Sequence, residues 1–285
     1  PLISDDRDLW SNDSQAVYYH HLQSIQALTI EEREEVRVST IGQAGNDTWF
    51  EERVGRLTAS VFKKAVRCRK PEYIVRGILC PKPRRQLPAT DPREYGRLME
   101  PRAVEMYVLL RRYYDSETTV TPTGLHVHKE YPFLAASPDG IVRDGAEEGL
   151  LEVKCPSSKA NMTPEEACSD KKFCSMLVDD IVVLKRDHSY YYQVQGQLGV
   201  TGHAWCDFVI FTNCEDSVAR SVSVERIYFD VEFWENYLLP GLLYFYTRAV
   251  VPEMLTRRVK RFNKLYSEDA EYLSYTVYRK GTLPS

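Results

Sequence analysis

Three features that would mark a membrane, secreted or repetitive protein are missing from the sequence. Its longest apolar stretch, YLLPGLLYFYTRAVV, is interrupted by Pro240, Gly241 and Arg248 and is shorter than the ~20 apolar residues that span a bilayer. The N-terminal PLISDDRDLW is acidic, whereas a secretion signal is basic and then apolar, and no internal repeat is present. We expect a soluble intracellular protein, nuclear or cytoplasmic, without a membrane partner. Its first residue is Pro in place of Met, which suggests a fragment of a longer chain.

The cysteines form no pattern of a disulfide framework or a metal site. There are seven, an odd number, with no CxxC pair and no Cys/His cluster at zinc-finger spacing. Neither a structural zinc nor an iron–sulfur cluster is therefore indicated. We expect free thiols in a reducing compartment.

Net charge is also low, at −4, so the molecule as a whole has no general attraction for polyanions. Its basic residues are nevertheless concentrated. The segment 63–85 holds nine basic residues and one acid, and a second basic cluster, RRVKRFNK, lies at 257–264. A charge run is usually a solvated helix face, but a nine-to-one excess raises the prospect of a surface that faces phosphates.

The hydrophobic pattern predicts helices at the start of the chain. Residues 1–45 read as helical, and Thr29 followed three residues later by Glu32 is a capping signal. The stretch 46–67 predicts two short helices that meet near Gly55. Residues 91–114 form the strongest helical pattern, in which Pro101 should cause a kink or a break.

The rest of the chain alternates between short strands and helices. TVTPTGLHVHKE, FLAASPDGIV and GLLEVKC are β-like runs separated by turn residues, which predicts a meander over 118–155. YYYQVQGQLGVTG reads as a helix, AWCDFVIFT and VARSVSVERI as strands, and the last third as helical. This order predicts an α/β fold in which a mixed sheet is flanked by helices.

One stretch, SPDGIVRDGAEEGLLEVKCP, carries the chemistry. Residues two apart on a strand share a face, so Glu152 and Lys154 point one way while Leu151 and Val153 point toward the core. If the strand containing Asp139 pairs with this one through the turn RDGAEEG, Asp139 lies beside Glu152. Charged cross-strand pairs are also common on the solvent faces of hairpins, and the residues alone leave both interpretations open.

A divalent cation would relieve the repulsion between the two carboxylates. Mg²⁺ prefers oxygen ligands, which Asp139, Glu152 and the backbone carbonyl of Val153 can supply. Such a metal polarises a scissile phosphate and lowers the pKa of a bound water, and Lys154 could orient that water or stabilise transition-state charge. Glu100, next to Pro101 on the margin of its helix, could look into the same cleft.

At this point the sequence resembles a known family. SPDG followed by LLEVKCP is similar to the core of the PD-(D/E)xK nuclease superfamily, specifically the lambda-exonuclease-like, YqaJ-type viral recombinase family. WFEERVGRLTAS, YGRLMEPRAVEMY and YYYQVQGQLGV agree in order and spacing. The resemblance implies a restriction-endonuclease-like core with a central mixed sheet at 46–250, with a helical N-terminal extension at 1–45 and a C-terminal helical segment at 251–285.

The resemblance also implies roles for individual residues. Asp139, Glu152 and the Val153 carbonyl would bind Mg²⁺ or Mn²⁺, Lys154 would be the catalytic lysine, and Glu100 would line the same site. Arg53, Ser60 and Ser137 would hold a terminal 5′-phosphate of the substrate. A helix at the edge of the site would contribute Gln193 and Gln195, of which Gln193 is the better candidate for contact with DNA or water.

The resemblance implies a metal-dependent DNA nuclease, specifically a 5′-to-3′ exonuclease on duplex ends that releases 5′-phosphate nucleotides. Two alternatives stay open: a structure-specific endonuclease on the same fold, and a silent nucleic-acid-binding module of a recombination or transposon-derived assembly. The family's ring-shaped oligomer does not carry over, because its interfaces are not motif residues.

Several conspicuous residues receive ordinary interpretations. His126 and His128 are expected to be surface histidines of a strand in preference to metal ligands. Asp179 and Asp180 are expected to lie in a loop or cap. The tyrosines at 190–192 could stack on bases, and packing in the core or a groove explains them equally well.

Overall fold

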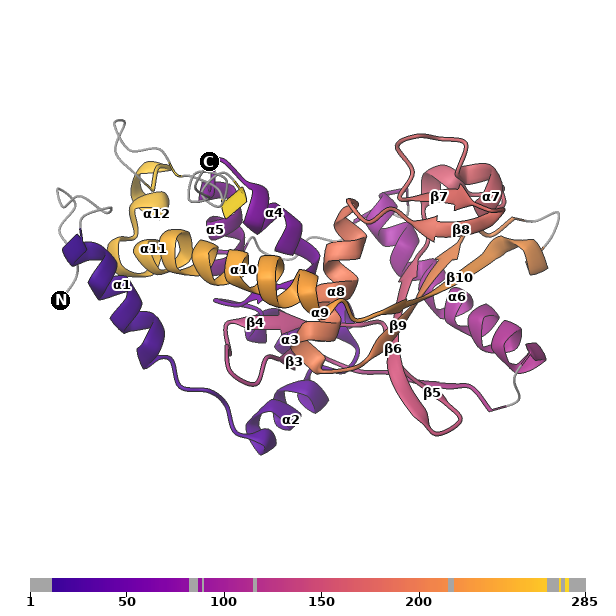
Figure 1. Cartoon of the computed structure of the whole chain (residues 1–285), viewed down its shortest axis with the longest axis horizontal. Helices are drawn as coiled ribbons and strands as arrows, with labels where there is room; N and C mark the ends of the chain where they lie inside the picture. The colour runs from indigo at the N-terminus through magenta and orange to yellow at the C-terminus, as the bar shows by residue number, and fades with distance from the viewer. Residues whose placement is uncertain are drawn as a thin grey trace.

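A five-stranded mixed sheet contains the strand that holds the candidate catalytic residues Glu152 and Lys154 (Figure 1). The computed structural model describes residues 12–81, 87–88, 90–114, 117–214, 218–265, 272 and 275–276. The strand order is β10-β9-β6-β5-β2, with β6 parallel to β9 and the other neighbours antiparallel. The strands are β2 (Thr119–Thr121), β5 (Gly140–Asp144), β6 (Glu147–Lys154), β9 (Trp205–Phe211) and β10 (Val222–Tyr228). The expected α/β fold with a central mixed sheet is therefore confirmed.

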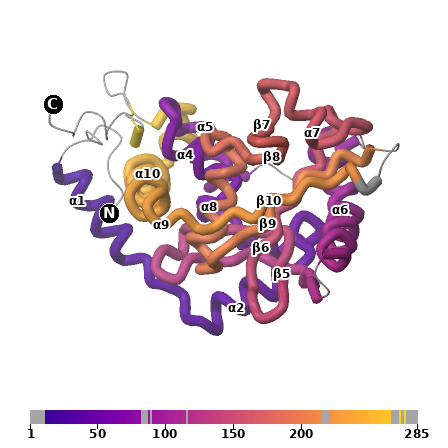
Figure 2. Tube along the Cα trace, turned by 45° about the vertical axis from the view of Figure 1, so that its right-hand side comes forward, coloured from indigo at the N-terminus to yellow at the C-terminus, as the bar shows by residue number. Residues whose placement is uncertain are grey.

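One helix covers each face of this sheet, as Figure 2 shows for α6 (Pro92–Tyr114) and α8 (Ser189–Thr201). Successive residues of β6 point to opposite faces, so Leu151 and Val153 pack in the cluster that contains Tyr107 of α6. Leu150, on the other face, packs in the cluster that contains Leu198 of α8. Strand β6 is buried on both sides, and its position between the two helices fixes where Glu152 and Lys154 lie.

Helix α6 runs without interruption through Pro101, so the chain does not break there. The helix contributes Ala103 and Tyr107 to the core under the sheet. The free energy gained by packing this long helix against the sheet outweighs the loss of the one backbone hydrogen bond that the proline removes.

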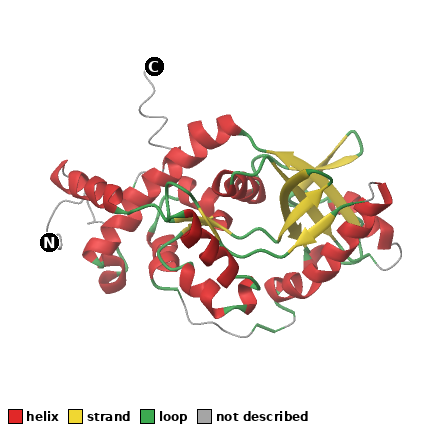
Figure 3. Ribbon diagram, turned by 90° about the horizontal axis from the view of Figure 1, so that it is seen from below, coloured by secondary structure: helices red, strands yellow, loops and turns green. Residues whose placement is uncertain are grey.

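Most of the other helices gather on one side of the molecule, away from the main sheet (Figure 3). The largest apolar cluster lies among them and includes Phe62, Leu242, Phe245 and Val250. The helices before the sheet are α1 (Asn12–Ser24), α2 (Ile30–Ser39), α3 (Asp47–Glu52), α4 (Phe62–Arg67) and α5 (Glu72–Leu79). Those after it are α9 (Val231–Phe233), α10 (Leu239–Phe245), α11 (Val251–Thr256) and α12 (Arg258–Phe262), with π-helical turns at Trp234–Leu238 and Tyr246–Val250. No described helix is both long and apolar enough to cross a membrane.

The helix boundaries follow the local signals in the sequence. Thr29 caps α2 through a capping box in which its side chain accepts from the Glu32 N–H and Glu32 accepts from the Thr29 N–H. The two short helices predicted after residue 46 are present, separated by a turn at Gly55, whose φ of 80° suits a glycine, and by β1. The second of them begins with the 3₁₀ turn Ala59–Val61.

The expected meander over 118–155 is wrong in its middle. Strands β3 (His126–Val127) and β4 (Leu134–Ala136) leave the main sheet and form a small sheet with β1 (Leu57–Thr58). β4 pairs in parallel with β1, with Leu57 opposite Leu134. This pairing joins segments far apart in sequence and buries Leu134 among the helices, so no local pattern predicts it.

A second hairpin, β7 (Ser175–Val178) and β8 (Ile181–Leu184), stands beside the main sheet. Asp179 and Asp180 form its two-residue turn, and both have positive φ, 50° and 61°. Asp tolerates this left-handed backbone better than most residues. The expectation that these acids lie in a loop is confirmed.

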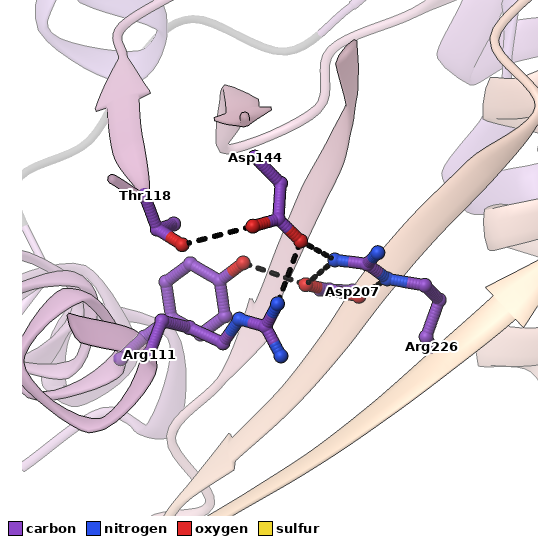
Figure 4. Close-up of polar contacts among 6 residues, drawn as sticks. Arg111, Thr118, Asp144, Asp207 and Arg226 are labelled. Atoms are coloured by element: carbon purple, nitrogen blue, oxygen red, sulfur yellow. Dashed lines mark hydrogen bonds and ion pairs between the residues drawn. The ribbon is translucent and has the colours of Figure 1, made fainter. Parts of the chain in front are cut away.

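A buried ionic network ties α6 to the sheet (Figure 4). Arg226 of β10 contacts Asp207 of β9 (Nε to Oδ1, 2.8 Å) and Asp144 of β5 (Nη2 to Oδ2, 2.7 Å). From α6, the Tyr107 hydroxyl donates to Asp207 at 2.6 Å and Arg111 donates to Asp144 at 2.6 Å. The network therefore connects three strands to the helix that carries Glu100.

Removing Asp207 should be costly, because the residue is buried and its loss leaves Arg226 and Tyr107 without their shared acceptor. We expect Asp207→Ala to lower the free energy of unfolding by about 3 kcal/mol. Urea denaturation measures this change. As a control, Arg143→Ala breaks an exposed ion pair with Glu148 on the same sheet and should change the free energy of unfolding by less than about 1 kcal/mol.

Candidate active site

The site forms where β5 separates from β6. Gly140, the first residue of β5, lies opposite Leu151 at the end of the pairing with β6, and the Asp139 N–H before it donates to the Leu151 carbonyl at 2.9 Å. Beyond this point the Asp139 side chain takes the place of the partner strand, because its Oδ2 accepts a hydrogen bond from the Val153 N–H at 2.7 Å. The N–H and C=O of a strand residue point toward the same neighbour. The Val153 carbonyl therefore faces the side of β6 on which Asp139 lies.

Glu152 points from β6 toward the face of the sheet that α8 covers, and it is only 1% exposed. Its Oε1 accepts from the Lys154 ammonium and from Gln193 Nε2, the latter at 2.6 Å. Its Oε2 accepts from Gln197 Nε2, also at 2.6 Å. A buried carboxylate needs such donors, and three side chains provide them here. Glu152 and Lys154 thus share a face, as their spacing predicts.

Helix α8 supplies two of those donors, but not the two glutamines named from the sequence. Gln193 is at the site as expected, whereas Gln195 points away: its Nε2 donates to the Tyr228 carbonyl and its Oε1 accepts from the Asp230 N–H. Residues four apart share a helix face and residues two apart do not. The partner of Gln193 is therefore Gln197, and this spacing was the available signal.

Asp139, Glu100 and Glu152 lie close enough together for their negative charges to repel one another. Burial, and then repulsion from Glu152 and Glu100, raises the pKa of Asp139 well above its usual range. Burial and then Glu152 also raise the pKa of Glu100, which α6 brings to the site. Burial alone would lower the pKa of Lys154, but the attraction of Glu152 and Asp139 outweighs it and the pKa rises. One lysine does not neutralise three neighbouring carboxylates.

These residues fit a divalent metal. Asp139, Glu152 and the Val153 carbonyl offer oxygen donors of the kind that Mg²⁺ prefers, and a cation would remove the repulsion that raises the pKa of Asp139. Among the described residues, no group of three His, Cys, Asp or Glu side chains is arranged to hold a metal. A metal here would complete its coordination with water or substrate oxygens.

A cleft of about 1730 Å³ opens at this end of the sheet. Glu100, Val153 and Lys154 line it, and its walls include the cations Lys159 and Lys172. The remaining wall comes from the start of α6, the chain after β6, residues 170–174 and the start of α8. The cleft is large enough for a nucleotide chain to reach the lysine.

Arg53 lies at the end of α3, above the Trp49 ring at 4.0 Å from its centroid. Its Nη2 donates to the Thr58 hydroxyl at 3.2 Å, and no carboxylate pairs with it in the described part of the chain. Burial lowers the pKa of Arg53 to about 10, so the guanidinium stays charged at neutral pH. A half-buried cation without a carboxylate is suited to an anionic ligand.

The two serines named with Arg53 are placed differently. Ser137 is connected to Arg53 through Trp49, whose Nε1 donates to the Ser137 hydroxyl at 2.8 Å. Ser60 is exposed on the 3₁₀ turn that begins at Ala59, two residues after the Arg53 partner Thr58. The Arg53 and Ser137 side chains thus form one contact chain, and Ser60 lies next to it along the backbone.

The expectation that His126 and His128 are surface histidines is wrong: His128 is buried and His126 is half-buried, and both make structural contacts. His128 Nδ1 accepts from the backbone N–H groups of Glu130 and Tyr131, and His126 Nε2 lies 2.9 Å from the Thr123 hydroxyl. Burial lowers the pKa of each histidine to about 4. Neither lies in the cleft, so they are not candidates for the metal.

The start of the basic run lies on α4 and contacts the chain at the start of α8. Lys63 donates to the Asp187 carbonyl, directly before the His188 that caps α8, and lies over the Tyr192 ring at 5.5 Å. Residues 82–86, which include the last basic residues of the run, lie outside the described residues. The second cluster packs beside α5, where Arg76 donates to the Val259 carbonyl at 2.8 Å.

Comparison with known proteins agrees with the fold and with the family resemblance. Residues 48–204, more than half of the chain, match the YqaJ-like viral recombinase domain. The chain belongs to this family, which confirms the resemblance seen in the sequence. No curated protein matches in sequence.

Solved structures share the fold. An alkaline exonuclease from Laribacter hongkongensis is 24% identical, with a TM-score of 0.55 over 76% of this chain and 99% of that one. The same exonuclease in complex with dAMP gives 24% identity and a TM-score of 0.52, over 73% of this chain and 92% of that one. The shutoff and exonuclease protein of Kaposi's sarcoma-associated herpesvirus is 13% identical, with a TM-score of 0.50 over 82% and 75% of the two chains.

Proposed function

We propose that this protein is a metal-dependent DNA nuclease that digests duplex DNA from an end, 5′ to 3′, and releases 5′-phosphate mononucleotides. The observation that carries the proposal is the convergence of Asp139, Glu152 and Lys154 at one end of the sheet, beside an open cleft. Family membership supports the nuclease class. The dAMP complex of the Laribacter exonuclease supports a nucleotide ligand in such a fold.

The proposed metal is Mg²⁺ or Mn²⁺, held by Asp139, Glu152 and the Val153 carbonyl. When bound, it supplies Lewis-acid polarisation of the phosphate and a water of lowered pKa. Lys154, which lines the cleft, orients the attacking water or stabilises charge on the phosphorane. Glu100 accepts a hydrogen bond from water at the same place, and Gln193 keeps Glu152 oriented through its 2.6 Å hydrogen bond.

Preference for ends rests on Arg53 with Ser60 and Ser137, which would hold the terminal 5′-phosphate. The guanidinium has no carboxylate partner among the described residues and is fixed on Trp49, and Trp49 also holds Ser137. A phosphate bound there would supply the missing negative charge.

The structure-specific endonuclease and the silent binding module remain the alternatives to test. A silent module has no need for Asp139, Glu152 and Lys154 together, and all three are present in contact or near contact. Exonuclease and endonuclease share this chemistry and differ only in how the DNA is held.

End-labelled linear duplex and covalently closed circular duplex, each with Mg²⁺ or EDTA, separate these functions. We expect digestion of the linear DNA only, dependent on Mg²⁺, with 5′-phosphate mononucleotides as products. Cleavage of both substrates would instead establish an endonuclease. Binding of either DNA with no cleavage would overturn the proposal in favour of the binding module.

A further inference from the structure

Among the described residues, the ammonium of Lys154 contacts two side chains. One is Glu152 Oε1, and the other is the face of the Tyr190 ring, whose centroid lies 4.6 Å from Nζ. Tyr190 itself lines the cleft. An aromatic face attracts a cation through its quadrupole and carries no charge of its own.

Glu152 cannot be the sole support for the lysine during the reaction. Its Oε1 already accepts from Gln193, and its carboxylate is one of the proposed metal ligands. Binding of a cation to that carboxylate would weaken its attraction for the ammonium, because the two cations repel each other. A lysine stem is flexible, so the ammonium then needs another support to stay at the end of β6.

We propose that Tyr190 is the positioning residue for Lys154: its ring face holds the ammonium at the reaction site when Glu152 is engaged by the metal. This inference rests on the proposed nuclease function and adds a residue to it. A neutral ring suits the task, since it neither competes for the metal nor neutralises the lysine.

The Tyr190 ring is fixed by contacts that do not involve Lys154. Tyr190 lies in the first turn of α8, where its N–H donates to His188 Nδ1 at 3.2 Å. The rings of these two residues meet edge to face, with centroids 4.6 Å apart. On another side lies Phe208, at 6.1 Å, whose strand position is directly opposite Glu152. The ring is thus held by both the helix and the sheet that make the site.

The test compares Tyr190→Leu with Tyr190→Phe at saturating duplex DNA and Mg²⁺. Without the ring, kcat should fall about 3- to 30-fold, the range of a partly desolvated cation–π contact, with KM little changed. The phenylalanine variant retains the ring and should restore most of the lost rate. Tyr228→Leu removes an exposed ring from the end of β10 and serves as the control for a tyrosine outside the cleft.

Three outcomes would overturn the inference. In Tyr190→Leu, an increase in KM at unchanged kcat would mean that the ring binds DNA. If Tyr190→Phe is as slow as Tyr190→Leu, the effect belongs to the hydroxyl and not to the ring. Wild-type kinetics in Tyr190→Leu would show that the ring has no role. Thermal unfolding establishes that each variant is folded, and Tyr190→Met replaces the leucine variant if that one is not. Absence of Mg²⁺-dependent cleavage by the wild-type protein is a different result, which defeats the proposed function itself.

Discussion

Lys154→Ala and Glu152→Gln are each expected to reduce DNA cleavage by about 100-fold or more while DNA binding persists. The lysine variant loses the cation nearest the proposed reaction site, and the glutamine variant loses a charged metal ligand while keeping the side-chain shape against Gln193 and Gln197. Single-turnover digestion of end-labelled duplex measures the rate, and fluorescence anisotropy in EDTA measures the affinity for DNA.

The matched control is the exposed lysine–glutamate pair of Lys129 and Glu130, 3.5 Å apart and remote from the cleft lining. Lys129→Ala should leave both the cleavage rate and the DNA affinity as they are in the wild type. Cleavage at a normal rate by either Lys154→Ala or Glu152→Gln would refute the mechanism.

Arg53→Gln is expected to slow digestion of 5′-phosphorylated ends by about 10- to 100-fold and to leave 5′-hydroxyl ends nearly unaffected. Burial lowers the pKa of Arg53 to about 10, so the side chain still carries its charge at pH 7, and no carboxylate among the described residues pairs with it. The substitution therefore removes the charge that is proposed to bind the terminal phosphate, and an end without that phosphate has no contact to lose. Rates on the two kinds of end, measured on one duplex sequence, give the selectivity.

Arg56 is the control for this prediction, since its guanidinium is already paired with Glu52 at 2.7 Å and donates to the Pro132 carbonyl at 3.1 Å. Arg56→Gln should affect both kinds of end equally. An equal loss on both ends in Arg53→Gln would show that Arg53 supports the fold or general DNA binding, and the phosphate pocket would have to be placed elsewhere.

The strand residues of the site were predictable because strand geometry is rigid. Alternation along β6 puts Glu152 and Lys154 on one face whatever the rest of the fold does, and the short turn between β5 and β6 brings Asp139 to Val153. The identity of these residues therefore determined their arrangement, as it did for the helix start at Thr29.

The glutamine helix shows where the sequence was insufficient. Helix α8 is buried on nearly all sides, including Gln195 and Gln197, so no polar face indicates how the helix is rotated against the sheet. Family resemblance directed attention to Gln193 and Gln195, which are two residues apart. The packing of α8 against β4 and β9 decides which face of the helix meets the site. Once Gln193 lies there, the four-residue spacing places Gln197 beside Glu152.

The division of the strands into two sheets was hidden for a related reason. β3 and β4 read like the strands around them, and their departure depends on the parallel pairing of β4 with β1, which the chain reaches only through a long separation in sequence. Long-range pairing of this kind is decided by the assembled helices around Leu134 and not by the strand residues themselves.

The most direct test of the central claim is a calorimetric titration of Mn²⁺ into the wild-type protein, Glu152→Gln and Lys154→Ala without DNA. If Asp139, Glu152 and the Val153 carbonyl form a metal site, the wild type binds Mn²⁺ saturably. Lys154→Ala should bind equally or more tightly because a competing cation is gone, and Glu152→Gln should lose the binding. Unchanged Mn²⁺ affinity in Glu152→Gln would contradict the account.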